Sequence, residues 1–152
     1  MSGPLTILAV DDCRSTRRYL STLLDDAGHH VVTAGCARSA LRALRDLTPD
    51  VILTERALPG GLDGSALIRL LRRDGRFRDT PVLVVSDRDD PADLAAMDAA
   101  GASGWIAKPL RARALLGALT AVDAARDKRR AFASSRQVKP SRDMRVDLRS
   151  YT

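Results

Sequence analysis

Five short apolar runs alternate with five amphipathic segments along this chain of 152 residues, and this alternation restricts the fold more than any other feature. The apolar runs have the length and composition of strands, at residues 6–10, 31–34, 51–55, 82–85 and 104–107. Apolar side chains then recur at three- and four-residue spacing, which predicts helices at residues 15–27, 37–47, 64–73 and 92–100. A fifth helix is predicted from residue 111 to residue 125 or a turn or two beyond. Short connections between such units require right-handed crossovers and a parallel sheet with helices on both faces. The sequence therefore predicts a doubly wound α/β domain with three α/β/α layers.

The positive charge of the chain is concentrated at its C-terminal end. The formal net charge is +6, and residues 126–152 hold nine Lys or Arg against three Asp, so this segment accounts for the whole excess. From about residue 131 the segment has few apolar residues and many Arg and Ser, which is typical of a flexible tail. We therefore predict two parts: a folded domain at residues 1–125, and a basic helix extension with a flexible tail at residues 126–152.

The composition is that of an ordinary globular protein, and it disfavours several other classes. No apolar run approaches the ~20 residues that span a bilayer, and the first residues lack the charged and apolar regions of a signal peptide. Cys13 and Cys36 do not have the spacing of metal ligands, and free thiols are the simpler interpretation. We therefore expect a cytoplasmic protein without membrane insertion.

Polar side chains follow four of the predicted strands, at the point where each strand ends. They are Asp11 and Asp12, Glu55, Ser86 and Lys108. Each alone has a simple structural explanation, as a turn or cap residue, a loop residue or a solvated cation. Because parallel strands end at one edge of a sheet, we expect all of these side chains to meet there. Carboxylate oxygens suit Mg²⁺, while a hydroxyl and an ammonium group suit the oxygens of a phosphoryl group.

Four motifs stand in order along the chain: ILAVDDCRSTRR (7–18), DVILTERALPGGLDG (50–64), VLVVSD (82–87) and GASGWIAKP (101–109). Over about residues 5–120 they closely resemble the receiver domain of two-component response regulators. The residues around the last two motifs are most similar to the small stand-alone regulators of bacterial chemotaxis, the CheY type. This resemblance implies a flavodoxin-like sheet with strand order 2-1-3-4-5.

The resemblance also implies a metal site at the edge of the sheet. Asp11 and Asp12 match the family's acidic pair that binds Mg²⁺, and Glu55 stands at the position of the phosphoacceptor, which also contacts the metal. The backbone carbonyl of Ala57 is the remaining ligand that the family implies. Mg²⁺ is therefore the expected cofactor, with binding weakened or absent if Glu55 pairs with Lys108.

The same resemblance assigns three residues to the phosphoryl group and to the switch that responds to it. Ser86 matches the family's switch Ser or Thr, and Lys108 matches the Lys that bridges the phosphoryl oxygen and the acceptor. Trp105 occupies the aromatic position whose side chain swings between outward and inward rotamers. A core aromatic at the sheet edge is the other interpretation of Trp105.

The acceptor position departs from the family pattern, because the family has Asp where this chain has Glu55. Asp50 cannot replace it, since five residues of strand put Asp50 about 17 Å away at the opposite edge of the sheet. Asp63 is best explained as the N-cap of the next helix, after a loop one residue longer than usual. Asp87 adds negative charge beside the pocket. We therefore expect that Glu55 is not phosphorylated.

Two outcomes are open for Glu55. It can pair with Lys108 and recruit Ser86, which would mimic the phosphorylated state without a kinase. It can instead fill the site and leave a fixed scaffold. Both outcomes predict an atypical receiver that is locked or independent of phosphorylation.

The leading functional hypothesis is a stand-alone atypical response regulator receiver in two-component phosphorelay signalling, which is not an enzyme. The family commonly binds its partners through the fourth helix, fifth strand and fifth helix. We therefore expect a signalling protein, either a histidine kinase or an output target, to bind at residues 92–125. We also expect a monomer or a weak homodimer.

Three alternatives remain. The chain can be a chemotaxis-type receiver that is still phosphorylated. It can be a phosphotransferase or phosphatase of similar topology, although those enzymes need an Asp nucleophile where Glu55 stands. It can also be an adaptor that binds nucleic acid or an anionic surface through its basic tail. Nucleic acid is disfavoured as a partner, because Phe132 and Tyr151 are the only aromatic residues in the tail for stacking on bases.

Overall fold

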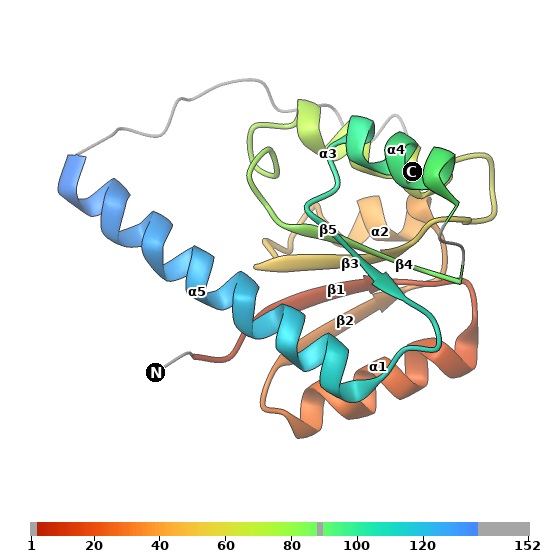
Figure 1. Cartoon of the computed structure of the whole chain (residues 1–152), viewed down its shortest axis with the longest axis horizontal. Helices are drawn as coiled ribbons and strands as arrows, with labels where there is room; N and C mark the ends of the chain where they lie inside the picture. Colours follow the sequence, from red (N-terminus) through yellow and green to blue (C-terminus); the bar gives the residue numbers. More distant parts are fainter. Residues whose placement is uncertain (1–2, 88–89, 137–152) are drawn as a thin grey trace.

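The computed structural model describes residues 3–87 and 90–136, and these form a five-stranded parallel sheet flanked by helices (Figure 1). The strands are β1 (Thr6–Val10), β2 (His30–Ala34), β3 (Val51–Glu55), β4 (Val82–Ser86) and β5 (Gly104–Ala107). Their order in the sheet is β2-β1-β3-β4-β5, and every neighbouring pair is parallel. This order confirms the predicted fold class, a doubly wound flavodoxin-like α/β domain.

Helices cover both faces of the sheet and divide the core into two clusters. They are α1 (Arg14–Asp26), α2 (Ala37–Ala43), α3 (Gly64–Arg73), α4 (Pro91–Ala100) and α5 (Ala112–Arg136). Leu8 and Ile52 belong to the cluster with α2, α3 and α4, whereas their strand neighbours Ile7 and Leu53 belong to the cluster with α1 and α5. Successive strand residues thus face opposite layers, and both layers are apolar. The buried strands are continuously hydrophobic for this reason.

Helix α2 is shorter than its sequence pattern predicts. It ends at Ala43, whereas the spacing of leucines predicts a helix to residue 47. Beyond Ala43 the backbone continues in tight turns, in which the N–H of Arg45 donates to the carbonyl of Arg42. Leu44 remains buried through these turns. The leucine spacing therefore reports burial correctly, although the helix has already ended.

Helix α5 is longer than predicted and extends well past the sheet (Figure 1). It continues to Arg136, so the prediction of a flexible tail is wrong for residues 131–136. Residues 137–152, the rest of the predicted tail, lie outside the described residues. The division of the chain at residue 125 stays a prediction.

Polar contacts between distant residues hold the extension of α5 against the domain. Arg126 forms ion pairs with Asp50, before β3, at 3.2 Å and with Asp123, on its own helix, at 2.7 Å. One turn further on, Nη1 of Arg129 donates to the carbonyl oxygen of Asp79 at 2.8 Å. These contacts explain why the helix continues where its apolar pattern fades.

Two expectations from the composition can be compared with the structure. Across residues 3–87 and 90–136, no helix is both long and apolar enough to cross a lipid bilayer. Cys13 and Cys36 are free thiols, as predicted.

Candidate functional site

The carboxyl edge of the sheet carries the predicted polar side chains. Glu55 and Ser86 are the last residues of β3 and β4, and Asp11 and Lys108 come directly after β1 and β5. Since β1, β3, β4 and β5 are consecutive neighbours in the sheet, their ends lie side by side. Asp11, Glu55 and Ser86 are buried, whereas the Lys108 side chain keeps 27% of its surface exposed. The site is therefore enclosed on the sheet side and open to water above Lys108.

Lys108 joins the two buried carboxylates of the site. Its Nζ lies 2.5 Å from Oε2 of Glu55 and 3.6 Å from Oδ2 of Asp11. The first contact is a short ion pair and the second is a longer and weaker one, and Oε2 of Glu55 accepts no hydrogen bond of regular geometry from the described residues. Glu55 is therefore the main partner of Lys108, and one outcome predicted from the sequence, the pairing of Glu55 with Lys108, is present in the structure.

The surroundings of this pair shift the pKa values of both partners. Burial raises the pKa of Glu55, and the ammonium of Lys108 opposes this rise without cancelling it. Burial alone would lower the pKa of Lys108, but its hydrogen bond to Glu55 and the charge of Asp11 outweigh burial and raise that pKa. The lysine therefore holds its proton firmly.

Backbone hydrogen bonds fix two of the site residues. The N–H of Lys108 donates to the carbonyl of Ser86 at 2.9 Å, which aligns the end of β5 with the end of β4. Oδ1 of Asp11 accepts the N–H of Cys13 at 2.8 Å, and Nη1 of Arg17 donates to the carbonyl of Asp11 at 2.6 Å. Asp11 is thereby anchored to the first turn of α1.

The loop after β3 depends on a glycine that sequence analysis did not single out. Gly64 begins α3, and a Cβ atom at this residue would collide with the carbonyl oxygens of Glu55 and Arg56. The side chain of Asp63 caps α3 by accepting the N–H of Ala66 at 2.8 Å, as predicted. Only a glycine allows the cap to lie this close to the backbone of the acceptor position.

The predicted metal ligands do not come together as one group. Asp11 is buried, whereas Asp12 and Ala57 are exposed. Among the described residues, no three His, Cys, Asp or Glu side chains lie close enough together to hold a metal ion. Lys108 contacts the carboxylates of Asp11 and Glu55, and a Mg²⁺ ion would have to compete with it for these oxygens. In this arrangement Lys108 occupies the carboxylate oxygens that a Mg²⁺ ion would need.

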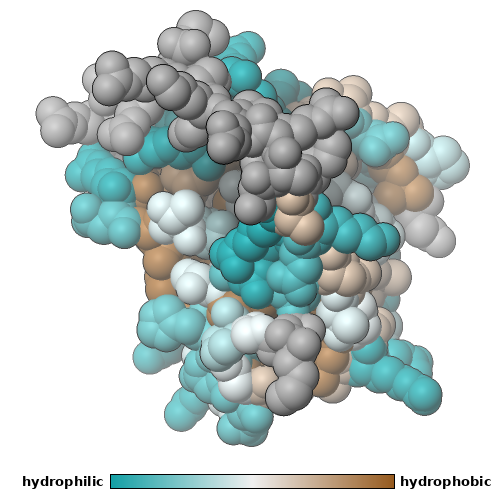
Figure 2. Space-filling model, turned by 90° about the vertical axis from the view of Figure 1, so that its left-hand side faces the viewer, coloured by the Kyte–Doolittle hydropathy of each residue, from teal (hydrophilic) through white to brown (hydrophobic). Residues whose placement is uncertain are grey.

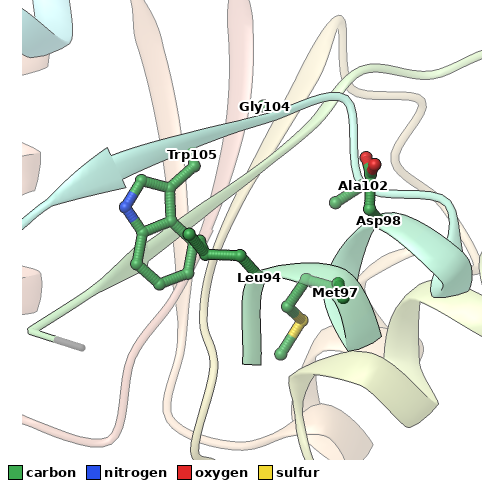
Figure 3. Close-up of a pocket in the computed structure, with 7 residues that line it drawn as sticks. Leu94, Met97, Asp98, Ala102, Gly104 and Trp105 are labelled. Atoms are coloured by element: carbon green, nitrogen blue, oxygen red, sulfur yellow. The ribbon is translucent and has the colours of Figure 1, made fainter. Parts of the chain in front are cut away.

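Trp105 lies on β5 beside α4. Figure 3 shows its indole next to Leu94 of α4, at a cavity of about 260 Å³ that Met97 and Gly104 also line. The indole is partly buried and packs against the core cluster under α2, α3 and α4. This position combines contact with the core and contact with solvent, and the role of Trp105 as a switch stays a prediction.

Sequence analysis missed two arginines that connect elements of the domain, one at the amino edge of the sheet and one beside Glu55. Arg72 is partly buried and donates to the carbonyl oxygens of Gly101 and Thr80 at 2.9 and 2.7 Å. Arg56, directly after Glu55, forms an ion pair of 3.7 Å with Asp93 in the first turn of α4. No local pattern could have identified the contacts with Gly101 and Asp93, because these join residues far apart in the sequence.

Comparisons with known proteins identify the family. The family model described as the response regulator receiver domain matches residues 7–120. Protein PilG of Pseudomonas aeruginosa is 32% identical over 120 residues, which are 79% of this chain and 88% of PilG. The transcriptional regulatory protein AfsQ1 of Streptomyces coelicolor is 31% identical over 117 residues, which are 77% of this chain and 50% of AfsQ1. The chain thus spans about half the length of that second relative.

A solved structure agrees with these sequence matches. The chemotaxis response regulator CheY4 of Vibrio cholerae superimposes with a TM-score of 0.74 at 33% identity, and the match covers 78% of this chain and 98% of CheY4. The shared features include the sheet order, since β1 lies between β2 and β3 as the resemblance implies. With its strand ends carrying Asp11, Glu55, Ser86 and Lys108, the chain belongs to the response regulator receiver domain family.

Proposed function

We propose that this chain is a stand-alone atypical receiver in which the Glu55–Lys108 pair takes the place of phosphorylation. The observation that carries the proposal is the 2.5 Å contact between Nζ of Lys108 and Oε2 of Glu55. In the family pattern Lys108 would bridge to a phosphoryl group on the acceptor. Here the side chain at the acceptor position reaches Lys108 directly, because Glu is one methylene longer than Asp.

The pair supplies part of what a phosphoryl group supplies. Glu55 brings one negative charge, whereas a phosphoryl group brings about −1.5 to −2 and three acceptor oxygens. A charge-assisted hydrogen bond of full strength contributes about 1.5–3 kcal/mol, which is the upper bound for this ion pair. At about 1.4 kcal/mol per tenfold, this would shift an equilibrium between two conformations by about 10- to 150-fold. A receiver with this pair would therefore stay predominantly in one state.

Weak binding of Mg²⁺ is part of the same proposal. If the ion binds, it would be held by Asp11, Asp12, Glu55 and the backbone carbonyl of Ala57, and it would neutralise negative charge there. Lys108 already performs this neutralisation for the two buried carboxylates, Asp11 and Glu55. We expect the ion to bind weakly for this reason.

The receiver would then signal by binding another protein. We propose α4, β5 and α5 as the binding face, with a histidine kinase or an output target as its partner in the cytoplasm. The proposed role is that of a signalling module and not of an enzyme, in a pathway of the two-component type. The similarity to CheY4, a chemotaxis protein, favours a chemotaxis-like pathway. A monomer or a weak homodimer is the proposed oligomeric state.

Chemical phosphorylation tests this function directly. The full chain is incubated with acetyl phosphate and Mg²⁺, and its intact mass is measured. We expect no phosphoryl adduct on the natural chain and an adduct on Glu55→Asp, because Asp restores the family's acceptor beside Asp11, Ser86 and Lys108. An Asp63→Asn variant of Glu55→Asp is the control, since its adduct must persist if residue 55 is the acceptor. A phosphoryl adduct that maps to Glu55 in the natural chain would contradict the proposal.

A further inference from the structure

The two ends of α4 are held to the domain in different ways. Its buried residues, Met97 and Ala100, both lie in the C-terminal half of the helix. At the same end Nε of Arg72 donates to the carbonyl oxygen of the C-cap residue, Gly101, at 2.9 Å. None of residues 91–96, all of which the structure describes, is buried. The C-terminal half of α4 is therefore anchored in the core, whereas the N-terminal half has few buried contacts to hold it.

Two neighbouring residues attach the N-terminal half of α4 to the rest of the domain. Asp93 forms an ion pair of 3.7 Å with Arg56, the residue directly after Glu55. Leu94 lies next to the indole of Trp105, and both line the cavity of about 260 Å³ (Figure 3). Asp93 and Leu94 are each partly buried. The first turn of α4 thus connects the end of β3 with the side chain of Trp105.

The ion pair between Arg56 and Asp93 is long and leaves a donor unused. Its 3.7 Å exceeds the length of a charge-assisted hydrogen bond. Nε of Arg56 is buried and has no hydrogen-bond partner among the described residues, which is a costly arrangement for a donor. The sequence of α4 contains no Lys or Arg, and its N-cap, Asp90, is a second carboxylate at this end. Arg56 therefore attracts the first turn of α4, and the pair can tighten or open without disturbing the core.

We propose that Arg56 is a positioning residue that transmits the state of Glu55 to Trp105 through Asp93 and the first turn of α4. Glu55 and Arg56 are consecutive, so a shift of the backbone at the end of β3 moves both side chains. The ion pair passes this shift to Asp93, and the neighbouring Leu94 passes it to the indole. The inference rests on the proposed function only in that the partner of Glu55 sets the state of the site.

A second route between the same residues runs along β5. Lys108, the partner of Glu55, comes three residues after Trp105, so a shift of Lys108 could reach the indole without α4. The two routes make different predictions. Transmission along β5 does not depend on the ion pair, whereas the proposed route fails when Arg56 or Asp93 loses its charge.

Quenching of Trp105 fluorescence by acrylamide tests the inference in the full chain, because Trp105 is the single tryptophan. Glu55→Gln removes the charge that pairs with Lys108, and we expect it to raise the quenching constant about twofold. This lies within the roughly fivefold population shift that a partly exposed ion pair supports. Arg56→Gln should raise the constant by a similar factor. The double variant Glu55→Gln/Arg56→Gln should raise it no further, because both changes interrupt one route.

Three further variants separate this route from general effects of charge and structure. Asp93→Asn breaks the pair from the other side and should match Arg56→Gln, whereas Arg56→Lys keeps the charge and should retain the response to Glu55→Gln. The control is Lys128→Gln, an exposed residue in the extension of α5. Figure 2 views the side at which α5 ends, and hydrophilic residues gather in the middle of this face. We expect Lys128→Gln to leave the quenching constant unchanged.

The outcomes distinguish the inference from the proposed function. Multiplied effects of Glu55→Gln and Arg56→Gln in the double variant would overturn the inference and favour transmission along β5. No change of quenching in Glu55→Gln, or an equal change in Lys128→Gln, would also overturn it. A phosphoryl adduct on Glu55 of the natural chain would disprove the proposed function and leave the quenching results unaffected.

Discussion

Each edge of the sheet holds one cation between two carboxylates, and the two arrangements differ in how firmly their members are fixed. At the carboxyl edge, Lys108 lies 2.5 Å from Glu55 and 3.6 Å from Asp11. The Lys108 side chain is 27% exposed and comes from the connection between β5 and α5. Water can therefore reach this cation, and one of its two contacts is long.

At the amino edge, both contacts of Arg126 are short and its side chain is 15% exposed. Asp50 is fixed there by a second bond, since its Oδ2 accepts the N–H of Thr6 at 2.8 Å. Asp123 is buried within the face of α5 that packs on the sheet. This arrangement joins the start of β1, the start of β3 and the extension of α5.

This difference indicates that the cation at the amino edge mainly stabilises the fold, whereas the cation at the carboxyl edge can exchange its place with another binding partner of the carboxylates. A buried carboxylate that loses its cation destabilises a fold strongly. At the carboxyl edge the cation itself is 27% exposed, so water, a proton or a metal ion can take its place and reduce this loss. The two edges should therefore respond differently to removal of their cations.

Removal of the cation at the amino edge should have the largest effect. Arg126→Ala leaves Asp123 buried without its partner, and we expect the free energy of unfolding to fall by about 2–3 kcal/mol. Urea denaturation followed by the fluorescence of Trp105, the single tryptophan, measures this change. Arg130→Ala, on the exposed part of the same helix, is the control and should cost no more than about 0.5 kcal/mol. Equal losses from both variants would show that Arg126 has no special role.

The helix cap beside the carboxyl edge should have an intermediate effect. Asp63→Ala removes the acceptor for the N–H of Ala66, and we expect a loss of about 1 kcal/mol at neutral pH. Burial alone would raise the pKa of Asp63, but hydrogen bonds from the Ala66 N–H and the Ser65 hydroxyl outweigh it and lower that pKa. The ionised cap thus stabilises the fold above the unfolded pKa of about 3.9, and its contribution is lost as the pH falls through the folded pKa.

Urea denaturation of the natural chain and the variant over a range of pH checks this sign. The difference between the two proteins should shrink as the pH falls below about 4. Asp63→Asn keeps a capping side chain without the charge, so it should lose less stability than Asp63→Ala at neutral pH. A difference between Asp63→Ala and the natural chain that grows toward low pH would contradict the role of the carboxylate.

Removal of the cation at the carboxyl edge should have the smallest effect on stability. We expect Lys108→Ala to change the free energy of unfolding by less than about 1 kcal/mol, because Glu55 has a raised pKa and can take a proton when Lys108 is absent. The variant should also gain stability when Mg²⁺ is added, since the ion no longer competes with the ammonium. Thermal melting with and without Mg²⁺ measures this gain, and Lys128→Ala is the control. A loss as large as that of Arg126→Ala would remove the contrast between the edges.

The sequence predicted the fold and the carboxyl edge for one physical reason. The alternation of strands and helices is local, and parallel strands always bring their ends together, so Asp11, Glu55, Ser86 and Lys108 could be placed without knowing any contact. The pairing of Glu55 with Lys108 was one of two open outcomes, because it depends on the length of a side chain and on the exact positions of two strand ends.

The amino edge and the connecting arginines could not be predicted in this way. Arg126 meets Asp50, and Arg72 meets Gly101, across long stretches of chain and without a repeating pattern. The length of α5 was underestimated for the same cause, since Arg126 and Arg129 hold the helix by polar contacts with distant residues. Exposed arginines in a helical pattern are indistinguishable from arginines that reach a distant carbonyl or carboxylate.

The length of α5 sets a minimum size for whatever binds along it. A groove between β5 and α5 is lined by Ala118 through Arg129, and a neighbouring depression continues to Ala114 near Lys108. At 1.5 Å per residue, the distance along the helix from Ala114 to Arg129 is about 22 Å. A partner segment must have about seven residues to cover this distance if it is extended, and about fifteen if it is helical. A shorter ligand could occupy only one end of the groove and could not contact α5 along the whole length from Ala114 to Arg129.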